Sequence, residues 1–205
     1  MEIAIIGTGN VGSALGSGWA KEGHNIIFGS RRPFDKRTKV LLSEIPGGRI
    51  ALPIEAAASA SIIVLATPFG KTPGIVRSLG NLTGKILLDA TNPIRESPTA
   101  ESGARAVEEA APTARVVKVF NATGADNMRN PMYGDHPIDM FVCSDDPEAR
   151  IIASTLAEEL GFRAIDCGGL DAAAMLEHLA KLWVRLAHQL GHGPDVAFKL
   201  VKRQV

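Results

Sequence analysis

The sequence predicts an α/β protein with a doubly wound, mostly parallel sheet and a helical C-terminal extension. Short apolar runs alternate with helical patterns along most of the 205 residues. These runs are continuously apolar, which is typical of strands that helices cover on both faces. After Leu170 the strand signals end and one long helical pattern follows. Together these observations give the fold class and place the extension at the C-terminus.

The first part of the chain contains six expected strands. A helical face made of apolar residues follows the first of them; its members are Val11, Ala14, Leu15 and Trp19. The intervals between the later strands leave room for crossover helices. The six strands are expected over residues 3–7, 25–29, 49–52, 61–67, 85–91 and 115–120.

Two further strands, 139–144 and 163–168, flank an expected helix. This helix begins at Asp146 and has Pro147 at its first position, which is a favourable N-terminal pair. We expect the two strands to extend the sheet.

The C-terminal segment reads as one helix from residue 170 that ends in residues 191–194. Glu177 and His178 are expected on its polar side, although one of them could reach the cleft. A short helix from Val196 to about Lys202 is expected to close the chain. The apolar stripe of the long helix consists of Leu176, Leu179, Ala180, Trp183, Leu186, Ala187 and Leu190. We expect a domain over residues 1–169 and an extension over 170–205 that packs on it, covers a ligand cleft or forms a homodimer contact.

Composition excludes several partner classes. Lys plus Arg and Asp plus Glu number 22 each, so the chain has no general basic field for nucleic acid or anionic lipid. Its apolar runs are too short to cross a membrane. Cys143 and Cys167 lack metal-ligand spacing and are read as small buried thiols. We therefore expect a cytoplasmic protein with no metal site.

A glycine-rich loop follows the first strand. Gly7, Gly9 and Gly12 stand between this strand and an amphipathic helix. In a dinucleotide-binding loop of the Rossmann type, the first glycine permits the turn, the second lets the backbone approach a pyrophosphate, and the third lets helix and strand pack closely. The amides at the helix N-terminus would face the phosphates. The alternative is a structural turn without a ligand.

The end of the second strand indicates which dinucleotide binds. NAD-preferring sites usually carry Asp or Glu there, whereas this chain has Ser30, Arg31 and Arg32. Two guanidinium groups can bind a phosphate through charge-assisted hydrogen bonds. The residues therefore favour NADP over NAD. A solvated turn with two arginines is the alternative.

Small hydrogen-bonding residues recur at three later strand ends, where the reactive end of the cofactor would lie. They are Thr67, Asn92, Asn121 and Thr123, and Pro68 and Pro93 accompany them. Such residues can orient a carboxamide or a flat heterocycle, with Asn121 and Thr123 as candidate orienting residues. They are also ordinary turn residues.

No histidine, lysine or carboxylate stands in a motif for general acid–base catalysis. Reduction of a ketone needs a proton donor at the carbonyl oxygen. Hydride exchange between two stacked heterocycles depends mainly on proximity and orientation. The pattern therefore favours hydride exchange.

The chain resembles the family of NADP oxidoreductases that depend on coenzyme F-420, a deazaflavin. The resemblance rests on the stretches GTGNVG, GSRR, ATPF, KVFNATG and DAAAMLEHLAKLWVRLA. Where archaeal members carry a histidine after the VVK strand, this chain has Asn121.

The resemblance implies roles for individual residues. Thr8, Asn10 and Val11 would lie along the pyrophosphate, and Thr67 and Pro68 would border the nicotinamide. Ser30 and Arg31, with Arg32, would hold the 2′-phosphate. The deazaflavin would stack on the nicotinamide, between the loop after Phe120 and the C-terminal helix. We expect a homodimeric NADPH-dependent oxidoreductase.

The sequence is also compatible with two other functions. One is an NADPH reductase of a flavin, quinone or imine. The other is an NADP(H)-binding sensor, in which side chains such as Phe69, Phe120 or Trp183 would fill the second-substrate slot.

Overall fold

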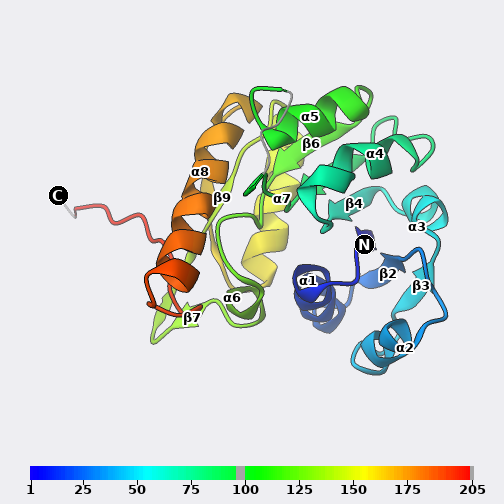
Figure 1. The fold of residues 1–205 in the computed structure, drawn as a ribbon, viewed down its shortest axis with the longest axis horizontal. Coiled ribbons are helices and arrows are strands. Elements are labelled where there is room, and N and C mark those ends of the chain that lie inside the picture. Colours follow the sequence, from blue (N-terminus) through cyan, green and yellow to red (C-terminus); the bar gives the residue numbers. More distant parts are fainter. Residues whose placement is uncertain (96–99, 204–205) are drawn as a thin grey trace.

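The computed structural model describes residues 1–95 and 100–203. Its centre is a parallel six-stranded sheet with the strand order β3-β2-β1-β4-β5-β6 (Figure 1). This is the order of doubly wound dinucleotide-binding folds. The strands are β1 (Glu2–Ile6), β2 (Asn25–Gly29), β3 (Arg49–Ala51), β4 (Ile62–Leu65), β5 (Ile86–Asp89) and β6 (Arg115–Lys118). Each overlaps one predicted strand, and the predicted fold class is confirmed.

Helices cover both faces of the sheet (Figure 1). Alternate residues of β1 point into two hydrophobic clusters, one with Ile3 and Ile5 and the other with Ala4 and Ile6. The first cluster includes residues of α1, α2 and α7, and the second includes residues of α3, α4, α5 and α8. The helices are α1 (Asn10–Lys21), α2 (Lys36–Ser43), α3 (Pro53–Ser59), α4 (Thr72–Arg77), α5 (Gly103–Ala110), α6 (Ala125–Arg129), α7 (Pro147–Glu159) and α8 (Ala173–Val184). Helices on both faces explain why the strands are continuously apolar.

The last two predicted strands exist but do not join the large sheet as regular strands. β9 (Asp139–Val142) and β10 (Arg163–Asp166) form a separate parallel pair. A single antiparallel bridge between Lys118 and Cys143 connects them to β6. The pairing ends there because Ser144 donates its amide to Gly168 O and its hydroxyl to Val116 O. β7 (Met132–Tyr133) and β8 (His136–Pro137), which were not predicted, form a small antiparallel pair.

The long C-terminal helix is confirmed in outline. It begins as a 3₁₀ turn, η2 (Leu170–Ala172), continues as α8 and ends as a π turn, η3 (Arg185–Gln189). The predicted stripe is too long, because Leu190 is 56% exposed. The predicted placement of Glu177 is wrong, because its side chain is buried.

The short helix predicted from Val196 to Lys202 is also wrong. This segment forms no helix: Ala197 packs against the hydrophobic core, and only the end of the chain projects from the body of the molecule (Figure 1). Its backbone bonds to β9 instead of to itself, since Phe198 O accepts from Asp139 N and Leu200 N donates to the Asp139 carboxylate. Lys199 Nζ adds a bond to Pro137 O.

Among the described residues, no helix is both long and apolar enough to cross a membrane. Both cysteines are free; Cys143 is buried, as predicted, while Cys167 is half-buried.

Candidate cofactor site

The glycine loop combines two crowded positions with one open position. A Cβ atom at Gly7, whose φ is +123°, would lie 2.3 Å from Ala66 O, and one at Gly12 would lie 2.2 Å from Gly7 O. A Cβ atom at Gly9 would have no neighbour within 4 Å. Packing within the protein therefore requires glycine at Gly7 and Gly12. At Gly9 the protein leaves space, which is where a pyrophosphate would approach the backbone.

The N-terminus of α1 is also available to an anion. Gly9 is the N-cap residue of α1, and no side chain caps this N-terminus. The first turn of α1 contains no acidic residue. The uncapped amides and the helix dipole both favour negative charge. Thr8 is half-buried and Asn10 is exposed at this end. These observations fit a dinucleotide pyrophosphate better than a purely structural turn.

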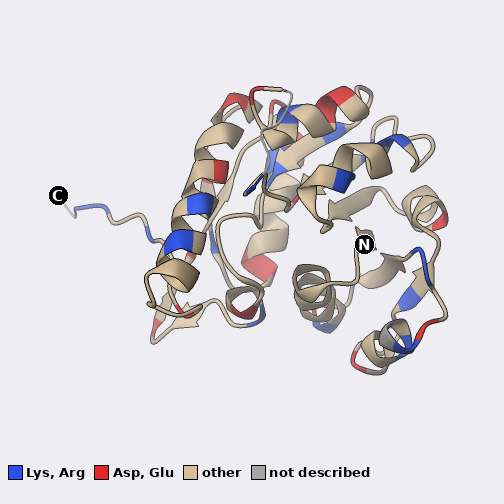
Figure 2. Cartoon of the chain, in the orientation of Figure 1, with Lys and Arg blue, Asp and Glu red and all other residues tan. Residues whose placement is uncertain are grey.

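The second predicted element, Ser30 to Arg32, lies beside this loop. Gly29 pairs with Ile6 across β1 and β2, and Gly7 N donates to Gly29 O at 3.3 Å. Ser30 Oγ accepts from Arg32 N at 3.1 Å, which keeps its own hydroxyl proton available. Both arginines are exposed, in the connection from β2 to α2 (Figure 2). Their assignment to the 2′-phosphate stays a prediction.

One neighbour of the arginines was missed by the sequence reasoning. Phe34 is 87% exposed, an unusual position for a large aromatic side chain. An exposed aromatic next to a phosphate site is a suitable surface for a flat base.

The polar residues at the ends of β4, β5 and β6 are not all brought together. Thr67 Oγ1 lies 2.8 Å from Thr72 Oγ1, and Pro68 is exposed. Thr123 Oγ1 accepts from Asn127 Nδ2 at 2.7 Å. In contrast, Asn92 Nδ2 donates to Asn121 O at 2.8 Å, and Asn121 Nδ2 donates to Asn92 Oδ1 at 2.9 Å. The structure therefore links the second and third strand ends directly.

The Asn121 amide has a fixed orientation. Its Nδ2 donates both to Asn92 Oδ1 and to Leu176 O of α8, so exchanging its nitrogen and oxygen would place oxygen against two acceptors. Asn121 Oδ1 is buried and has no hydrogen-bond partner among the described residues. Buried acceptors without a partner are uncommon in folded proteins, so this oxygen marks an unusual position at the end of β6.

The backbone before Asn121 is strained. Phe120 has a φ of 57°, which a bulky residue rarely adopts. Its ring points into the core and contacts Trp19 edge to face, with centroids 5.4 Å apart. Trp183 lies over the next loop, because a Cβ atom at Gly124 would be 2.6 Å from Trp183 Cη2. Strain at such a position is typical of functional sites.

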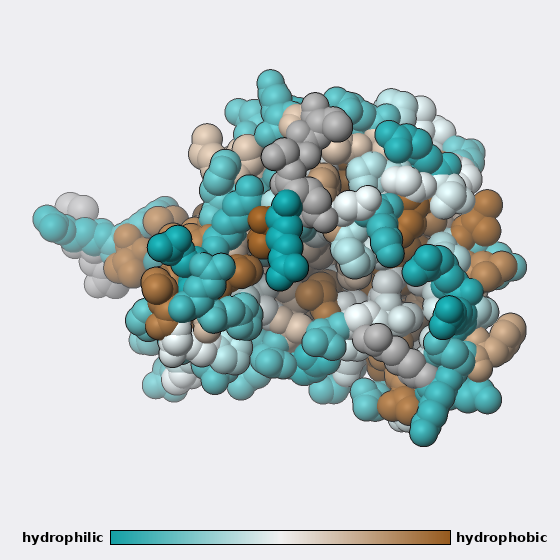
Figure 3. All heavy atoms as spheres, viewed as in Figure 1, coloured by the Kyte–Doolittle hydropathy of each residue, from teal (hydrophilic) through white to brown (hydrophobic). Residues whose placement is uncertain are grey.

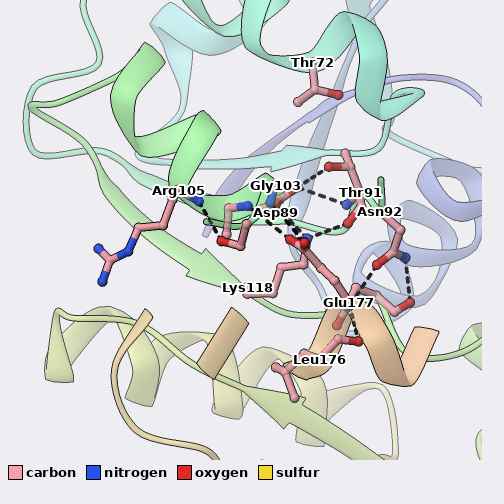
Figure 4. Close-up of polar contacts among 12 residues, drawn as sticks. Thr72, Asp89, Thr91, Asn92, Gly103, Arg105, Lys118, Leu176 and Glu177 are labelled. Carbon is pink, nitrogen blue, oxygen red and sulfur yellow. Dashed lines mark hydrogen bonds and ion pairs between the residues drawn. The ribbon is translucent and has the colours of Figure 1, made fainter. Parts of the chain in front are cut away.

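A buried ion cluster beneath these strand ends was not predicted. Lys118 Nζ on β6 lies 2.9 Å from Asp89 Oδ2 on β5 and 3.0 Å from Glu177 Oε1 on α8 (Figure 4). Lys118 and Asp89 are fully buried and Glu177 nearly so. The two carboxylates hold the pKa of Lys118 above its usual value, although desolvation opposes them. We refer to Asp89, Lys118 and Glu177 as the buried ion cluster.

A pocket of about 320 Å³ is lined by residues of α8 and η3 and by Ile94. It combines apolar walls with two cationic side chains, and Ile94, two residues after Asn92, closes one side. Figure 3 shows hydrophobic surface in the hollow of this face, with hydrophilic side chains around it. The lining residues are Ile94, Lys181, Leu182, Val184, Arg185 and Gln189.

Comparison with known proteins gives consistent relatives. The profile of the family described as NADP oxidoreductase, coenzyme F-420-dependent, matches residues 2–93. An F-420-dependent NADP reductase of Methanothermobacter marburgensis is 32% identical over 91% of this chain and 92% of its own length.

Solved structures agree with the fold. A candidate F-420-dependent NADP reductase from Arthrobacter sp. FB24 superposes with a TM-score of 0.88 at 31% identity, over 98% of this chain and 100% of its own. An imine reductase of Streptomyces aurantiacus gives a TM-score of 0.68 at 17% identity, over 93% of this chain and 63% of its own. The latter similarity concerns the fold alone.

Proposed function

The chain belongs to the family of F-420-dependent NADP reductases, and from this premise we propose that it exchanges hydride between NADP(H) and the deazaflavin coenzyme F-420. One observation carries most of the proposal. The glycine loop leaves open space at Gly9, at an uncapped helix N-terminus. Beside it, the second strand ends in Ser30, Arg31 and Arg32, without an acid. This combination fits NADP.

In this proposal the chain binds NADP(H) along the carboxyl ends of β1, β2 and β4. Residues 7–12 hold the pyrophosphate through backbone amides. Arg31 and Arg32, with the Ser30 hydroxyl, bind the 2′-phosphate. Phe34 offers its exposed ring to the adenine. Thr67 and Pro68 border the nicotinamide.

The bound nicotinamide and deazaflavin supply the chemistry, a hydride moving between nicotinamide C4 and deazaflavin C5. The chain's own residues orient the two rings. Asn92 and Asn121 form a neutral, mutually bonded pair at the ends of β5 and β6. The hydride would add at deazaflavin C5, and the proton that balances it would be taken from solvent at N1, so the pair needs no acid or base partner at the carbon atoms that exchange hydride.

The second substrate would lie between the loop after Phe120 and α8. The pocket lined by Ile94 and α8 is the candidate site for it and carries Lys181 and Arg185. Apolar walls with two cations suit an anionic heterocycle. Of the side chains named for the sensor hypothesis, Phe120 packs in the core and Phe69 is buried near Gly103. Trp183 of α8 lies against Gly124, in the loop after Phe120.

We also propose that the protein is a cytoplasmic homodimer formed through α8. Met175 and Leu182, seven residues apart, are 70% and 45% exposed on this helix. Two turns of a helix separate such residues, so they lie near one face. Light scattering of the wild-type protein and of Met175→Glu tests the dimer, which the substitution should dissociate.

The function is tested by mixing the protein with NADPH and oxidised coenzyme F-420 and following the deazaflavin absorbance, with NADH as the paired control. Rapid bleaching with NADPH and little with NADH is expected. Tight NADPH binding without bleaching would refute the deazaflavin reaction, and a panel of flavin, quinone and imine acceptors would then separate another reductase from a sensor.

A further inference from the structure

The buried ion cluster fastens α8 to the sheet with unusual completeness. The three protons of the Lys118 ammonium have three acceptors: Asp89 Oδ2 at 2.9 Å, Glu177 Oε1 at 3.0 Å and Thr91 O at 2.5 Å. Asp89 Oδ1 accepts from the amide and the hydroxyl of Thr91. Each proton of the ammonium group therefore has its own acceptor, and the Asp89 carboxylate has further hydrogen-bond donors in Thr91.

Glu177 has a second set of contacts, at the N-terminus of α5. Its Oε2 accepts from Gly103 N at 3.0 Å and its Oε1 from Ala104 N at 3.1 Å (Figure 4). Because the helix dipole favours an anion there, Glu177 has a favourable site only at one rotation and depth of α8.

Gly103 makes this approach possible. A Cβ atom at this position would lie 2.9 Å from Glu177 Oε1 and 2.8 Å from Phe69 Cε2. Phe69 follows Pro68 in the loop that borders the nicotinamide end of the proposed site. Gly103 therefore lies between Glu177 and the loop that would border the cofactor.

The neighbouring residue of α8 reaches the proposed reaction centre directly. Leu176 O accepts from Asn121 Nδ2 at 3.0 Å, and this bond helps to fix the Asn121 amide. One turn of α8 therefore links the buried ion cluster to Asn121. The following turns carry Lys181 and Arg185 of the pocket.

A buried ion cluster is a poor source of net stability. Removing charges from water costs about as much as their attraction returns, and neutral groups of similar shape often serve as well. Charged groups do, however, discriminate strongly between correct and shifted packing arrangements. Such discrimination is what residues need if they fix the position of a helix.

We propose that Asp89, Lys118 and Glu177 are positioning residues that set the rotation and depth of α8, and thereby align the second-substrate pocket with Asn121. The inference rests on the proposed function. The three residues would contact neither substrate and would act on the second-substrate pocket through the position of α8. The phosphate groups of NADP would bind at residues 7–12 and 30–32, which none of the three residues contacts, so we expect NADPH affinity to change little.

The test uses a neutral variant that keeps the shape of the cluster, Asp89→Asn, Lys118→Met and Glu177→Gln combined. Hydrogen exchange of residues 173–184 should accelerate, and kcat/KM for coenzyme F-420 should fall at least about tenfold, because small misplacement of reacting groups is costly. The NADPH Kd and the urea midpoint should stay at the wild-type values.

A second variant covers the case in which the first does not fold. Gly103→Ala crowds Glu177 without removing a charge, and Gly74→Ala in α4, where a Cβ atom has no neighbour within 4 Å, is its control. Gly103→Ala should reproduce the faster exchange and the lower kcat/KM, and Gly74→Ala should not.

Three results would overturn the proposal. The variants could show the same hydrogen exchange of α8 as the wild-type protein, they could show faster exchange with an unchanged kcat/KM, or they could lose NADPH affinity as much as they lose kcat/KM. If the wild-type protein itself leaves coenzyme F-420 oxidised, the proposed function fails. Exchange of α8 and NADPH affinity then still test the positioning role.

Discussion

The glycine loop and the buried ion cluster differ in how far their groups are exposed. A Cβ atom at Gly9 would meet open space, no side chain caps the N-terminus of α1, and Arg31 is exposed to solvent. Around Lys118 every charged group is enclosed and satisfied by neighbouring residues. We expect groups that bind a ligand to be exposed to it, and groups that position a helix to be paired with other residues of the protein. The contrast predicts different responses to substitution in the two regions.

The largest effect is expected from Lys118→Met. It leaves the Asp89 and Glu177 carboxylates buried without their cation, so the free energy of unfolding should fall by about 3–5 kcal/mol. Urea denaturation measures this. Arg105→Met is the matched control, because Arg105 also bridges two carboxylates, Glu108 and Asp145, but near the surface. Its expected loss is about 0–1 kcal/mol. Equal losses would remove the distinction between the two clusters.

The next effect separates two glycines of the same loop. Gly12→Ala places a methyl group against Gly7 O and should destabilise the protein by about 1–3 kcal/mol. Gly9→Ala should leave the thermal unfolding temperature unchanged and still weaken NADPH binding, because its methyl group would occupy the space of the pyrophosphate. Unfolding scans and fluorescence titration with NADPH report the two quantities. Undiminished NADPH affinity in Gly9→Ala would show that no phosphate approaches this residue.

A smaller effect concerns the choice of cofactor. Arg31→Ala should weaken NADPH by ~2 kcal/mol through loss of a charge-assisted contact and should leave NADH nearly unaffected. Paired titrations with both nucleotides measure the difference. Arg77→Ala removes the same charge from exposed α4 and should change neither affinity. If Arg31→Ala weakens both nucleotides equally, residues 30–32 do not bind the 2′-phosphate.

The smallest effect probes how well the enclosed region excludes solvent. Burial raises the pKa of the Cys143 thiol to about 12. The folded state therefore favours the protonated thiol, and this contribution to stability is present below the ordinary pKa near 9 and lost as the pH rises toward 12. Cys143→Ala should flatten the fall of the urea midpoint above pH 9. Iodoacetamide at pH 8 should modify half-buried Cys167 before Cys143, and the reverse order would contradict an enclosed Cys143.

The same contrast explains what the sequence could predict. The glycine loop is local: Gly7, Gly9 and Gly12 occupy fixed offsets between a strand and a helix, and the structure shows that spacing in place. Continuous apolar runs predicted the parallel sheet because helices on both faces leave the strands no polar side. The role of residues 30–32 stays a prediction.

The buried ion cluster could not be found in this way. Lys118 and Glu177 are 59 positions apart in the chain, and the helical pattern puts Glu177 on the polar side of its helix. A signal existed in two adjacent runs: an Asp ends one apolar strand and a Lys interrupts the next. Only the pairing of β5 with β6 makes them partners. The extended tail was missed for a similar reason, because its backbone partners belong to β9.

One measurement tests the central claim most directly. NADPH in which both hydrogens at nicotinamide C4 are replaced by deuterium is mixed with the protein and oxidised coenzyme F-420, and the reduced deazaflavin is examined by mass spectrometry. Direct hydride exchange predicts that deuterium appears at deazaflavin C5, at a rate slowed by the isotope. Reduced deazaflavin that contains only solvent hydrogen, or no reduction at all while NADPH is bound, would contradict the account.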